Sequence, residues 1–379
     1  MARINRNYEK LPGSYLFSEI GRRTAAYQEA NPDARLIKMG IGDVTRPLAP
    51  AVVAAMHAAV NDLAAAETFH GYGPEQGYAF LRDAIAEHDF AARNIAIAPD
   101  EIFVSDGAKS DCGNIGDIFA EDNIVAVCDP VYPVYVDTNA MAGRAGDYDA
   151  DTERWTNIVY MPTTAENDFT PALPDVPVDL IYLCSPNNPS GNCFPKKEIE
   201  KVIRRFNGIV ILDEAYIDFA GQPGFLSELD EYPNLVILQT LSKAWGMAGL
   251  RLGLAFAQPL IVDTLSRVKY PYNINVVTQK IVLEQLRRSP DAQIAEIVSE
   301  RGRVLEGLAK NPVIRKIHPT DANFVLVEVD EPRTIYDRLI GAGIIVRDRS
   351  RIKGCEGCLR ITIGTPEEND RLLETLKKL

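Results

Sequence analysis

Two ionisable residues stand at the ends of apolar runs of the kind that form buried strands. Asp213 ends the run Ile209–Asp213, and Lys243 follows the run Leu235–Thr240. A carboxylate at such a place is costly unless a cation or a strong donor pairs with it. An amine at such a place can form a Schiff base with a carbonyl compound. Taken singly, Asp213 is more typical of a helix N-cap and Lys243 of a solvated loop.

A flat aromatic ligand with a pyridinium nitrogen would give Asp213 its cationic partner. The carboxylate would keep that nitrogen protonated, and the protonated ring could then accept electrons. Tyr216, three residues after Asp213, and Asn188, in a polar turn after another apolar run, could both bond a hydroxyl on the ring. Tyr132 offers an aromatic face on which the ring could stack. Ordinary turn chemistry would explain the Asn188 segment equally well.

A second group of residues could hold a phosphate. Thr240, Ser242 and Arg251 supply two hydroxyls and a guanidinium near Lys243. The segment from Gly107 to Lys109 lies between an expected strand and an expected helix, where free backbone N–H groups can bind an anion. An ordinary strand-to-helix turn would explain that segment as well. The set becomes specific through its common position, because open α/β sheets bind ligands beyond the carboxyl ends of their strands.

The elements that position these residues alternate between short apolar runs and longer helical patterns. The expected strands are 102–105, 124–128, 180–184, 209–213, 235–240 and 252–256. The expected helices are 49–66, 78–93, 111–119, 196–206 and 278–287. Most of the strands are almost continuously apolar, as strands covered on both faces are. The alternation predicts an α/β fold with a large, mostly parallel, doubly wound sheet.

The pattern changes after Asn275. Helices near 291–310 and 333–342, strands at 323–329, 344–347 and 359–363, and a final helix from Pro366 are expected there. These elements predict a smaller α+β domain, and a strand at 36–40 is expected to join it. We therefore predict an N-terminal arm with part of the small domain at 1–48, a large domain at 49–275, and a C-terminal small domain at 276–379.

Composition and charge exclude several kinds of protein. The chain has 379 residues and a net charge of −13, which disfavours binding to nucleic acid or anionic lipid. No apolar stretch approaches the roughly 20 residues that span a bilayer, and the polar start is unlike a secretory signal. A cytoplasmic location is expected. Cys355 and Cys358 form one Cys-x-x-Cys with no histidine nearby in the sequence, so no metal is expected.

These motifs, in this order, resemble those of the fold-type I aminotransferases that depend on pyridoxal 5′-phosphate (PLP). By that resemblance the domain at 49–275 binds PLP, and Lys243 is the Schiff-base lysine that moves protons. Asp213 pairs with the pyridine nitrogen, Asn188 and Tyr216 bond the ring hydroxyl, and Tyr132 stacks on the ring. The residues implied to hold the phosphate are Gly107, Ala108, Lys109, Thr240, Ser242 and Arg251.

The resemblance also implies partners. Tyr72 matches a tyrosine that reaches the phosphate of the neighbouring subunit, so a homodimer with shared active sites is expected. Arg360 matches the arginine that pairs with the α-carboxylate of the substrate. The partners implied are therefore a small amino donor and a 2-oxo acid acceptor.

The two halves of the chain resemble different families within this class. Residues 1 to about 195 resemble LL-diaminopimelate aminotransferase, in stretches such as 71–77 and 129–138. Residues from about 196 to 379 resemble histidinol-phosphate aminotransferase, in stretches such as 212–219 and 239–245. A natural or constructed chimera would explain this pattern, and so would an unusual branch of the superfamily.

The far end of the substrate pocket leaves the choice of substrate open. For LL-diaminopimelate, the implied residues are Glu75 and Lys109, with Tyr15 closing the pocket and Gly42 beside the substrate. For histidinol phosphate, the implied residue is Arg347, although 347–353 could also be a solvated basic loop. We expect transfer from LL-diaminopimelate to 2-oxoglutarate. The alternatives are histidinol-phosphate transamination in histidine biosynthesis and a PLP-binding protein with little turnover.

Overall fold

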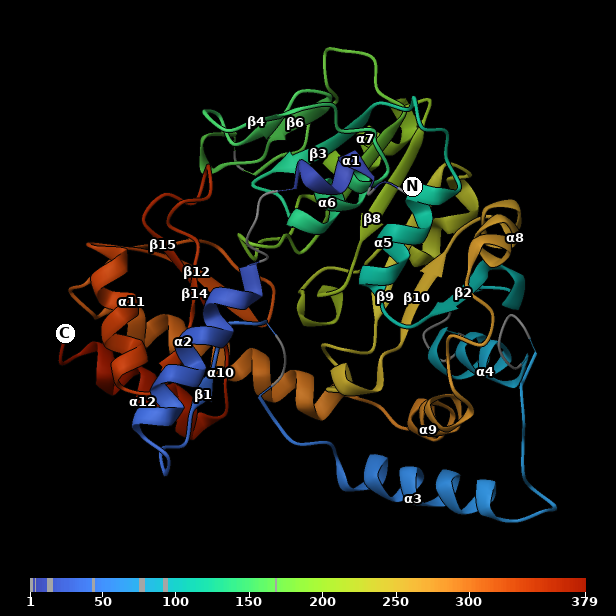
Figure 1. Cartoon of the computed structure of the whole chain (residues 1–379), viewed down its shortest axis with the longest axis horizontal. Coiled ribbons are helices and arrows are strands. Elements are labelled where there is room, and N and C mark those ends of the chain that lie inside the picture. Colours follow the sequence, from blue (N-terminus) through green and yellow to red (C-terminus); the bar gives the residue numbers. More distant parts are fainter. Residues whose placement is uncertain are drawn as a thin grey trace.

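A seven-stranded sheet forms the centre of the larger part of the molecule in the computed structural model (Figure 1). The structure describes residues 3, 5–11, 16–42, 45–74, 79–90, 95–167 and 169–379. The strands are β2 (Ile102–Ser105), β3 (Val125–Asp129), β6 (Ile158–Pro162), β7 (Leu180–Cys184), β8 (Ile209–Asp213), β9 (Leu235–Thr240) and β10 (Gly253–Phe256). Their order is β2-β10-β9-β8-β7-β3-β6, and only β10 runs against its neighbours.

Helices cover both faces of this sheet. They are α3 (Pro50–Ala64), α4 (Ala79–Ala84) continued by a π-helical turn (Ile85–Phe90), α5 (Ala108–Asp117), α6 (Pro133–Met141), α7 (Lys196–Arg205), α8 (Pro259–Val268) and α9 (Val276–Leu286). Successive side chains of a strand enter opposite cores, since Val210 and Leu212 lie in one hydrophobic cluster and Ile211 in the other. This double burial explains why the strand sequences are almost continuously apolar.

The predicted α/β fold with its mostly parallel sheet is confirmed. The six expected strands are present, with ends that differ by at most one residue. The predicted elements did not include β6, which lies at the sheet edge and is only partly buried, or helices α6 and α8. The helix expected at 78–93 is shorter where the structure describes it, because a π-helical turn follows Ala84.

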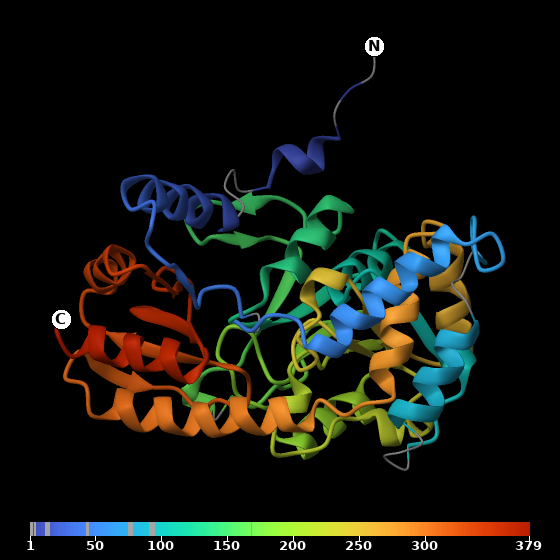
Figure 2. The ribbon, with the colours of Figure 1, turned by 90° about the horizontal axis from the view of Figure 1, so that it is seen from below.

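A second, smaller sheet lies beside the large one. Its strands β11 (Ile314–Ile317), β12 (Phe324–Val329), β15 (Cys358–Thr362) and β14 (Arg347–Asp348) pair in that order. Its helices are α10 (Asp291–Ala309), α11 (Pro332–Gly341) and α12 (Pro366–Leu376). Figure 2 shows α10, in orange, extending from the large sheet region along the smaller one. At its first turns Gln293 Nε2 donates to the carbonyl of Ala244, 2.8 Å away.

Residues 16–38 belong spatially to the smaller sheet region, whereas residues 6–9 contact α6 of the larger region. Strand β1 (Ile37–Lys38) pairs in parallel with β13 (Ile344–Ile345), and helix α2 (Leu16–Ala30) packs beside α11 (Figure 1). The short elements α1 (Arg6–Glu9), β4 (Tyr148–Asp149) and β5 (Arg154–Trp155) complete the chain. Helix α9 adds Ile281 and Leu286 to a core of the large sheet. The domain boundaries at 48 and 275 stay a prediction.

The sequence predicts neither a membrane-spanning helix nor a metal site, and both expectations can be compared with the described residues. Among them, no helix is long and apolar enough to cross a membrane. They also contain no group of three or more His, Cys, Asp or Glu side chains that could hold a metal. The sequence suggested no histidine near the Cys-x-x-Cys, yet β11 and its following turn bring His318 Nε2 to 3.8 Å from Cys358 Sγ. His318 and Cys358 are forty residues apart in the sequence, and they come together because β12 pairs in antiparallel fashion with both β11 and β15.

Candidate active site

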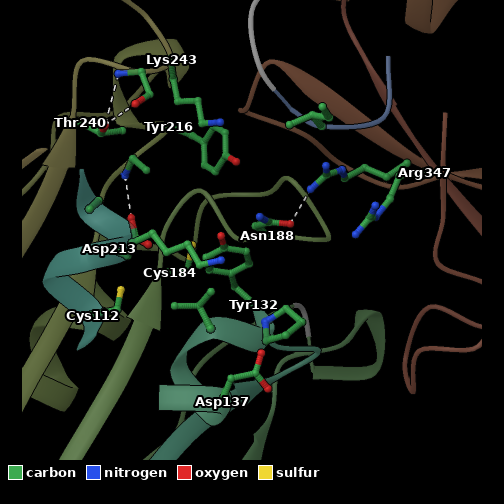
Figure 3. Close-up of a pocket in the computed structure, with 18 of the residues that line it drawn as sticks. Cys112, Tyr132, Asp137, Cys184, Asn188, Asp213, Tyr216, Thr240, Lys243 and Arg347 are labelled. Carbon is green, nitrogen blue, oxygen red and sulfur yellow. Dashed lines mark hydrogen bonds between the residues drawn. The ribbon is translucent and has the colours of Figure 1, made fainter. Parts of the chain in front are cut away.

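One rim of the large sheet gathers the chemically active residues. Gly253 at the start of β10 stands opposite both Ser105 and Thr240, at the ends of β2 and β9. Asp213 ends the neighbouring parallel strand β8. A cavity of about 820 Å³ opens beyond this rim and is closed on the other side by residues of the smaller sheet, including Arg347 (Figure 3).

Most of the predicted site residues line this cavity. They are Ala108, Lys109, Tyr132, Asn188, Asp213, Tyr216, Thr240, Ser242, Lys243, Arg251, Arg347 and Arg360. Two glycines lie directly behind the lining, since a Cβ atom at Gly107 would fall 2.3 Å from Arg251 and one at Gly42 would fall 3.3 Å from Arg360. Tyr72 is not part of the lining; it is 89% exposed, with its ring centroid 4.7 Å from that of Tyr272. Tyr15 and Glu75 lie outside the described residues.

Asp213 is a buried acid held in place by two donors. The Tyr135 hydroxyl donates to its Oδ2 at 2.5 Å, and the backbone N–H of Ala215 donates to its Oδ1 at 2.9 Å. Burial raises the pKa of Asp213, while the bonds from Tyr135 and Ala215 and the charge of Lys243 oppose that rise. A cation placed against this carboxylate would stabilise its charged form.

Lys243 enters the cavity from the loop that follows β9. Its Nζ lies 5.6 Å from the centroid of the Tyr216 ring, and both side chains face the cavity in Figure 3. The start of this loop is held by two bonds: the Thr240 hydroxyl donates to Ser242 Oγ at 2.9 Å, and Ser242 N–H donates to Thr240 Oγ1 at 3.2 Å. The amine therefore projects from a fixed loop at the edge of a rigid sheet.

The turn before α5 is closely packed against Arg251. Gly107 has φ +134°, and a Cβ atom there would lie 2.3 Å from Arg251 Nη2. Gly253 is similarly crowded, because its Cβ would lie 2.4 Å from the backbone nitrogen of Ala108. Helix α5 begins at Ala108, so its first N–H groups have no partners within the helix. A helix N-terminus beside a guanidinium and two hydroxyls suits a phosphate.

Arg360 occupies the opposite side of the cavity, on β15. Its Nη1 donates to Asn188 Oδ1 at 2.6 Å and its Nη2 to the Gly40 carbonyl at 3.0 Å. The guanidinium carbon lies 4.7 Å from the centroid of the Phe324 ring. This corner therefore joins the large sheet, the N-terminal segment and the smaller sheet. A carboxylate could accept from the same guanidinium.

The sequence analysis missed several residues of the site. Tyr135, which orients Asp213, comes from helix α6, whose first turn follows Tyr132. Arg349 also lines the cavity, as does Asp137, whose pKa burial raises to about 6 against the charge of Lys109. The spacing of Tyr132 and Tyr135, close to one helical turn, was the available signal for Tyr135. Asp137 and Arg349 add to the wall of the cavity, and Tyr135 supports Asp213 from behind that wall.

The residues present fit PLP. A buried acid at a strand end matches a pyridinium nitrogen, and Tyr132 supplies an aromatic face. The crowded glycine turn with Arg251 and the hydroxyls of Thr240 and Ser242 match a phosphate, and Lys243 matches an aldehyde. The fold and this set of groups define a PLP-dependent enzyme that acts on small molecules carrying a carboxylate.

Comparison with known proteins agrees with the assignment to a PLP-dependent enzyme. Residues 34–376 match the family model of aminotransferase class I and II, and the chain belongs to that family. It is therefore a PLP-dependent transaminase whose substrates are small amino and oxo acids. It is 42% identical to an LL-diaminopimelate aminotransferase of Lachnospira eligens, with all of both chains covered.

Solved structures of related enzymes share this fold. An L,L-diaminopimelate aminotransferase from Chlamydomonas reinhardtii is 30% identical and superimposes with a TM-score of 0.86 over 100% of this chain and 98% of that one. A histidinol-phosphate aminotransferase from Sinorhizobium meliloti in complex with PLP is 21% identical, with a TM-score of 0.78 over 100% and 97% of the two chains, and is similar in fold. The expected chimera finds no support, because the Lachnospira relative matches the chain from end to end.

Proposed function

We propose that the enzyme transfers an amino group from LL-diaminopimelate to 2-oxoglutarate. The observation that carries this proposal is the end-to-end match, at 42% identity, with an LL-diaminopimelate aminotransferase. The related Chlamydomonas enzyme, at 30% identity, supports it further. Arg347 lines the cavity together with Arg360, and two guanidinium groups suit a substrate with two carboxylates.

Five residues carry the chemistry in this proposal. PLP supplies an aldehyde for a covalent link to the amino group and a ring that accepts electrons. Lys243 forms the resting link to the cofactor and moves the proton at the substrate Cα. Asp213, supported by Tyr135, would hold a proton on the ring nitrogen. Asn188 and Tyr216 bond the ring hydroxyl.

Residues on two sides of the cavity bind and orient the cofactor and the substrate. Tyr132 would stack on the ring, and the turn of Gly107, Ala108 and Lys109 would hold the phosphate together with Thr240, Ser242 and Arg251. Arg360 binds the α-carboxylate, and Gly42 leaves room for it, since a Cβ there would crowd the guanidinium. Because a held carboxylate is not expelled, this geometry favours amino transfer over decarboxylation. Glu75 and Tyr15 complete the far end in the proposal.

A homodimer with shared active sites is part of the proposal. Tyr72 is highly exposed and stacks loosely with Tyr272, and Tyr270, nearby in sequence, is 83% exposed. Exposed aromatic side chains of this kind are enriched at protein interfaces. In a dimer Tyr72 reaches the phosphate of the neighbouring subunit. The cytoplasmic location stays a prediction.

Histidinol phosphate is a second candidate substrate, favoured by the arginines at 347, 349 and 351 that line the cavity. The test is a single-turnover half reaction of the PLP enzyme with each compound. LL-diaminopimelate should convert the bound cofactor to its amino form with a kcat/KM at least about 10-fold above that of histidinol phosphate. Faster conversion by histidinol phosphate would reverse the assignment. Release of carbon dioxide, or conversion by neither compound, would reject it.

A further inference from the structure

The cavity holds more positive charge than one α-carboxylate and one phosphate require. Its cationic lining residues are Lys109, Lys243, Arg251, Arg347, Arg349, Arg351 and Arg360, and its acidic ones are Asp137, Glu153 and Asp213. In the proposed function Lys109 and Arg251 serve the phosphate, Lys243 the cofactor aldehyde and Arg360 the α-carboxylate. Three arginines from one segment remain, at 347, 349 and 351.

Arg349 stands out among these three. Arg349 is only 4% exposed, whereas Arg351 is exposed. Its Nε and Nη1 atoms are buried and have no hydrogen-bond partner among the residues that the structure describes. Its backbone is fixed, because Arg349 N–H donates to the Cys358 carbonyl at 3.0 Å. The guanidinium is therefore presented to the cavity by a rigid segment.

The surroundings of Arg349 favour an anionic ligand beside its guanidinium. Burial and the like charges of Arg360 and Arg347 lower the pKa of Arg349 to about 9. A buried guanidinium with unpaired donors is costly, and two cationic neighbours add repulsion. Among the described residues no salt bridge to Arg349 offsets this cost. An acidic group of a ligand would satisfy the free donors and relieve the repulsion at once.

We propose that Arg349, beside Arg347, forms a subsite for a second anionic group at the far end of the substrate. The inference rests on the proposed function, because it assumes that Arg360 takes the α-carboxylate. The substrates are then amino and oxo acids whose side chain ends in a carboxylate or a phosphate. The γ-carboxylate of 2-oxoglutarate and the distal carboxylate of diaminopimelate both meet this requirement. Monocarboxylic amino acids do not.

The test measures how tightly three unreactive probes bind to the PLP-loaded enzyme. The probes are glutarate, propyl phosphate and butyrate. Binding is measured by calorimetry on the wild type, Arg349→Gln, Arg349→Lys and the control Lys353→Gln. The control removes one positive charge from the same loop, at an exposed position that does not line the cavity. Visible absorbance of bound PLP reports whether each variant has folded with its cofactor.

Glutarate should bind the wild type at least about 10-fold more tightly than butyrate, and Arg349→Gln should weaken glutarate by about 10- to 100-fold while changing butyrate less than about 2-fold. Arg349→Lys should recover part of the loss, since it keeps the charge without the planar fork. Tighter binding of propyl phosphate than of butyrate, lost in Arg349→Gln, would show that the subsite also accepts a phosphate.

Thermal unfolding gives a second readout that a purely structural role would not move. Glutarate should raise the Tm of the wild type and of Lys353→Gln, and it should leave the Tm of Arg349→Gln nearly unchanged. Equal losses for glutarate and butyrate in Arg349→Gln, or no loss for either, would overturn the subsite. If glutarate binding depends on Arg349 while LL-diaminopimelate fails in the half reaction, the proposed substrate is wrong and the subsite stands.

Discussion

The hydroxyl of Tyr135 donates a hydrogen bond to Oδ2 of Asp213 at a distance of 2.5 Å, in a site where both residues are buried. This bond comes from helix α6 and reaches the end of strand β8. It lowers the pKa of Asp213 against the effect of burial. A residue that does not itself line the cavity therefore favours the charged form of this acid.

Replacing Tyr135 by Phe should move the acid limb of the pH–rate profile to higher pH. Without the donor the pKa of Asp213 rises further, so a larger fraction of the acid is protonated at a given pH. We expect kcat to fall about 10-fold near neutral pH, the effect of losing one hydrogen bond to a charged group. Tyr182→Phe is the matched control, because the Tyr182 ring stacks on Tyr135 while the two bonds to Asp213 described above come from Tyr135 and Ala215. An unmoved acid limb in Tyr135→Phe would show that the bond does not control Asp213.

Lys243→Ala should abolish the covalent attachment of PLP. Borohydride reduction should then trap no cofactor on the chain, while the wild type retains it through denaturation. Turnover should fall by at least about 10³-fold, since both the link and the proton transfer depend on this amine. Lys243→Arg keeps the positive charge and should fail equally. Cofactor trapped on either variant would mean that another lysine carries it.

Arg360→Lys should lower kcat/KM for both the amino donor and the oxo acid by about 100-fold. The lysine keeps the charge and loses the planar fork that now spans Asn188 and the Gly40 carbonyl. Affinity for PLP should change less than about 3-fold, because the cofactor phosphate lies on the other side of the cavity in our proposal. Steady-state kinetics with each substrate and a PLP titration make the measurement. A loss confined to one of the two substrates would contradict a shared α-carboxylate site.

Gly107→Ala should weaken PLP binding by about 10- to 100-fold. The residue has φ +134°, a region that side chains rarely adopt, and the new Cβ would lie 2.3 Å from Arg251 Nη2. Gly249→Ala is the control, because no atom lies within 4 Å of the Cβ position there. Equilibrium dialysis of PLP with the two variants compares them. Equal affinity in both would remove Gly107 from the phosphate site.

Glu214→Gln should flatten the dependence of stability on pH. Burial raises the pKa of Glu214 to about 7 from an ordinary 4.5, although the Gln239 amide and the Phe225 N–H donate to it. Between those values the folded chain holds the proton and the unfolded chain releases it, so the free energy of unfolding falls as pH rises through this window. Above about pH 7 this contribution of Glu214 to the free energy of unfolding, about 3 kcal/mol, is completely lost. Urea unfolding at pH 5 and pH 8 should show a smaller difference for the variant than for the wild type.

The sequence predicted the strands well because they are buried on both faces. In β8 and β9 almost every residue is apolar, and the predicted bounds match the structure. Strand β6 escaped prediction because it lies at the sheet edge, where Val159 and Tyr160 are only half-buried. An edge strand carries a weaker apolar signal, so local sequence could not distinguish it from a loop.

The cofactor motifs were accessible to sequence analysis because each stands within a few residues of a strand end. Tyr135 and Arg349 were not, since their roles depend on packing between distant segments. From the sequence alone, the basic run from Arg347 to Lys353 could be either a solvated loop or a site that binds an anion. The structure divides it, burying Arg347 and Arg349 and exposing Arg351 and Lys353. Strand β14 positions Arg347, and the backbone bond from Arg349 N–H to the Cys358 carbonyl holds the next residues inward, whereas the turn that begins at Ser350 leaves Arg351 and Lys353 exposed.

The pairing of β1 with β13 sets an order on biosynthesis. Ile37 and its partner Ile344 are separated by most of the chain, so the first strand leaves the ribosome long before the segment that it must join. The large sheet, whose strands lie between Ile102 and Phe256, can assemble in the meantime. The wall that carries Gly40 and Arg360 closes only after Arg360 has been translated. A nascent chain stalled before residue 344 therefore has its cofactor rim without its carboxylate clamp.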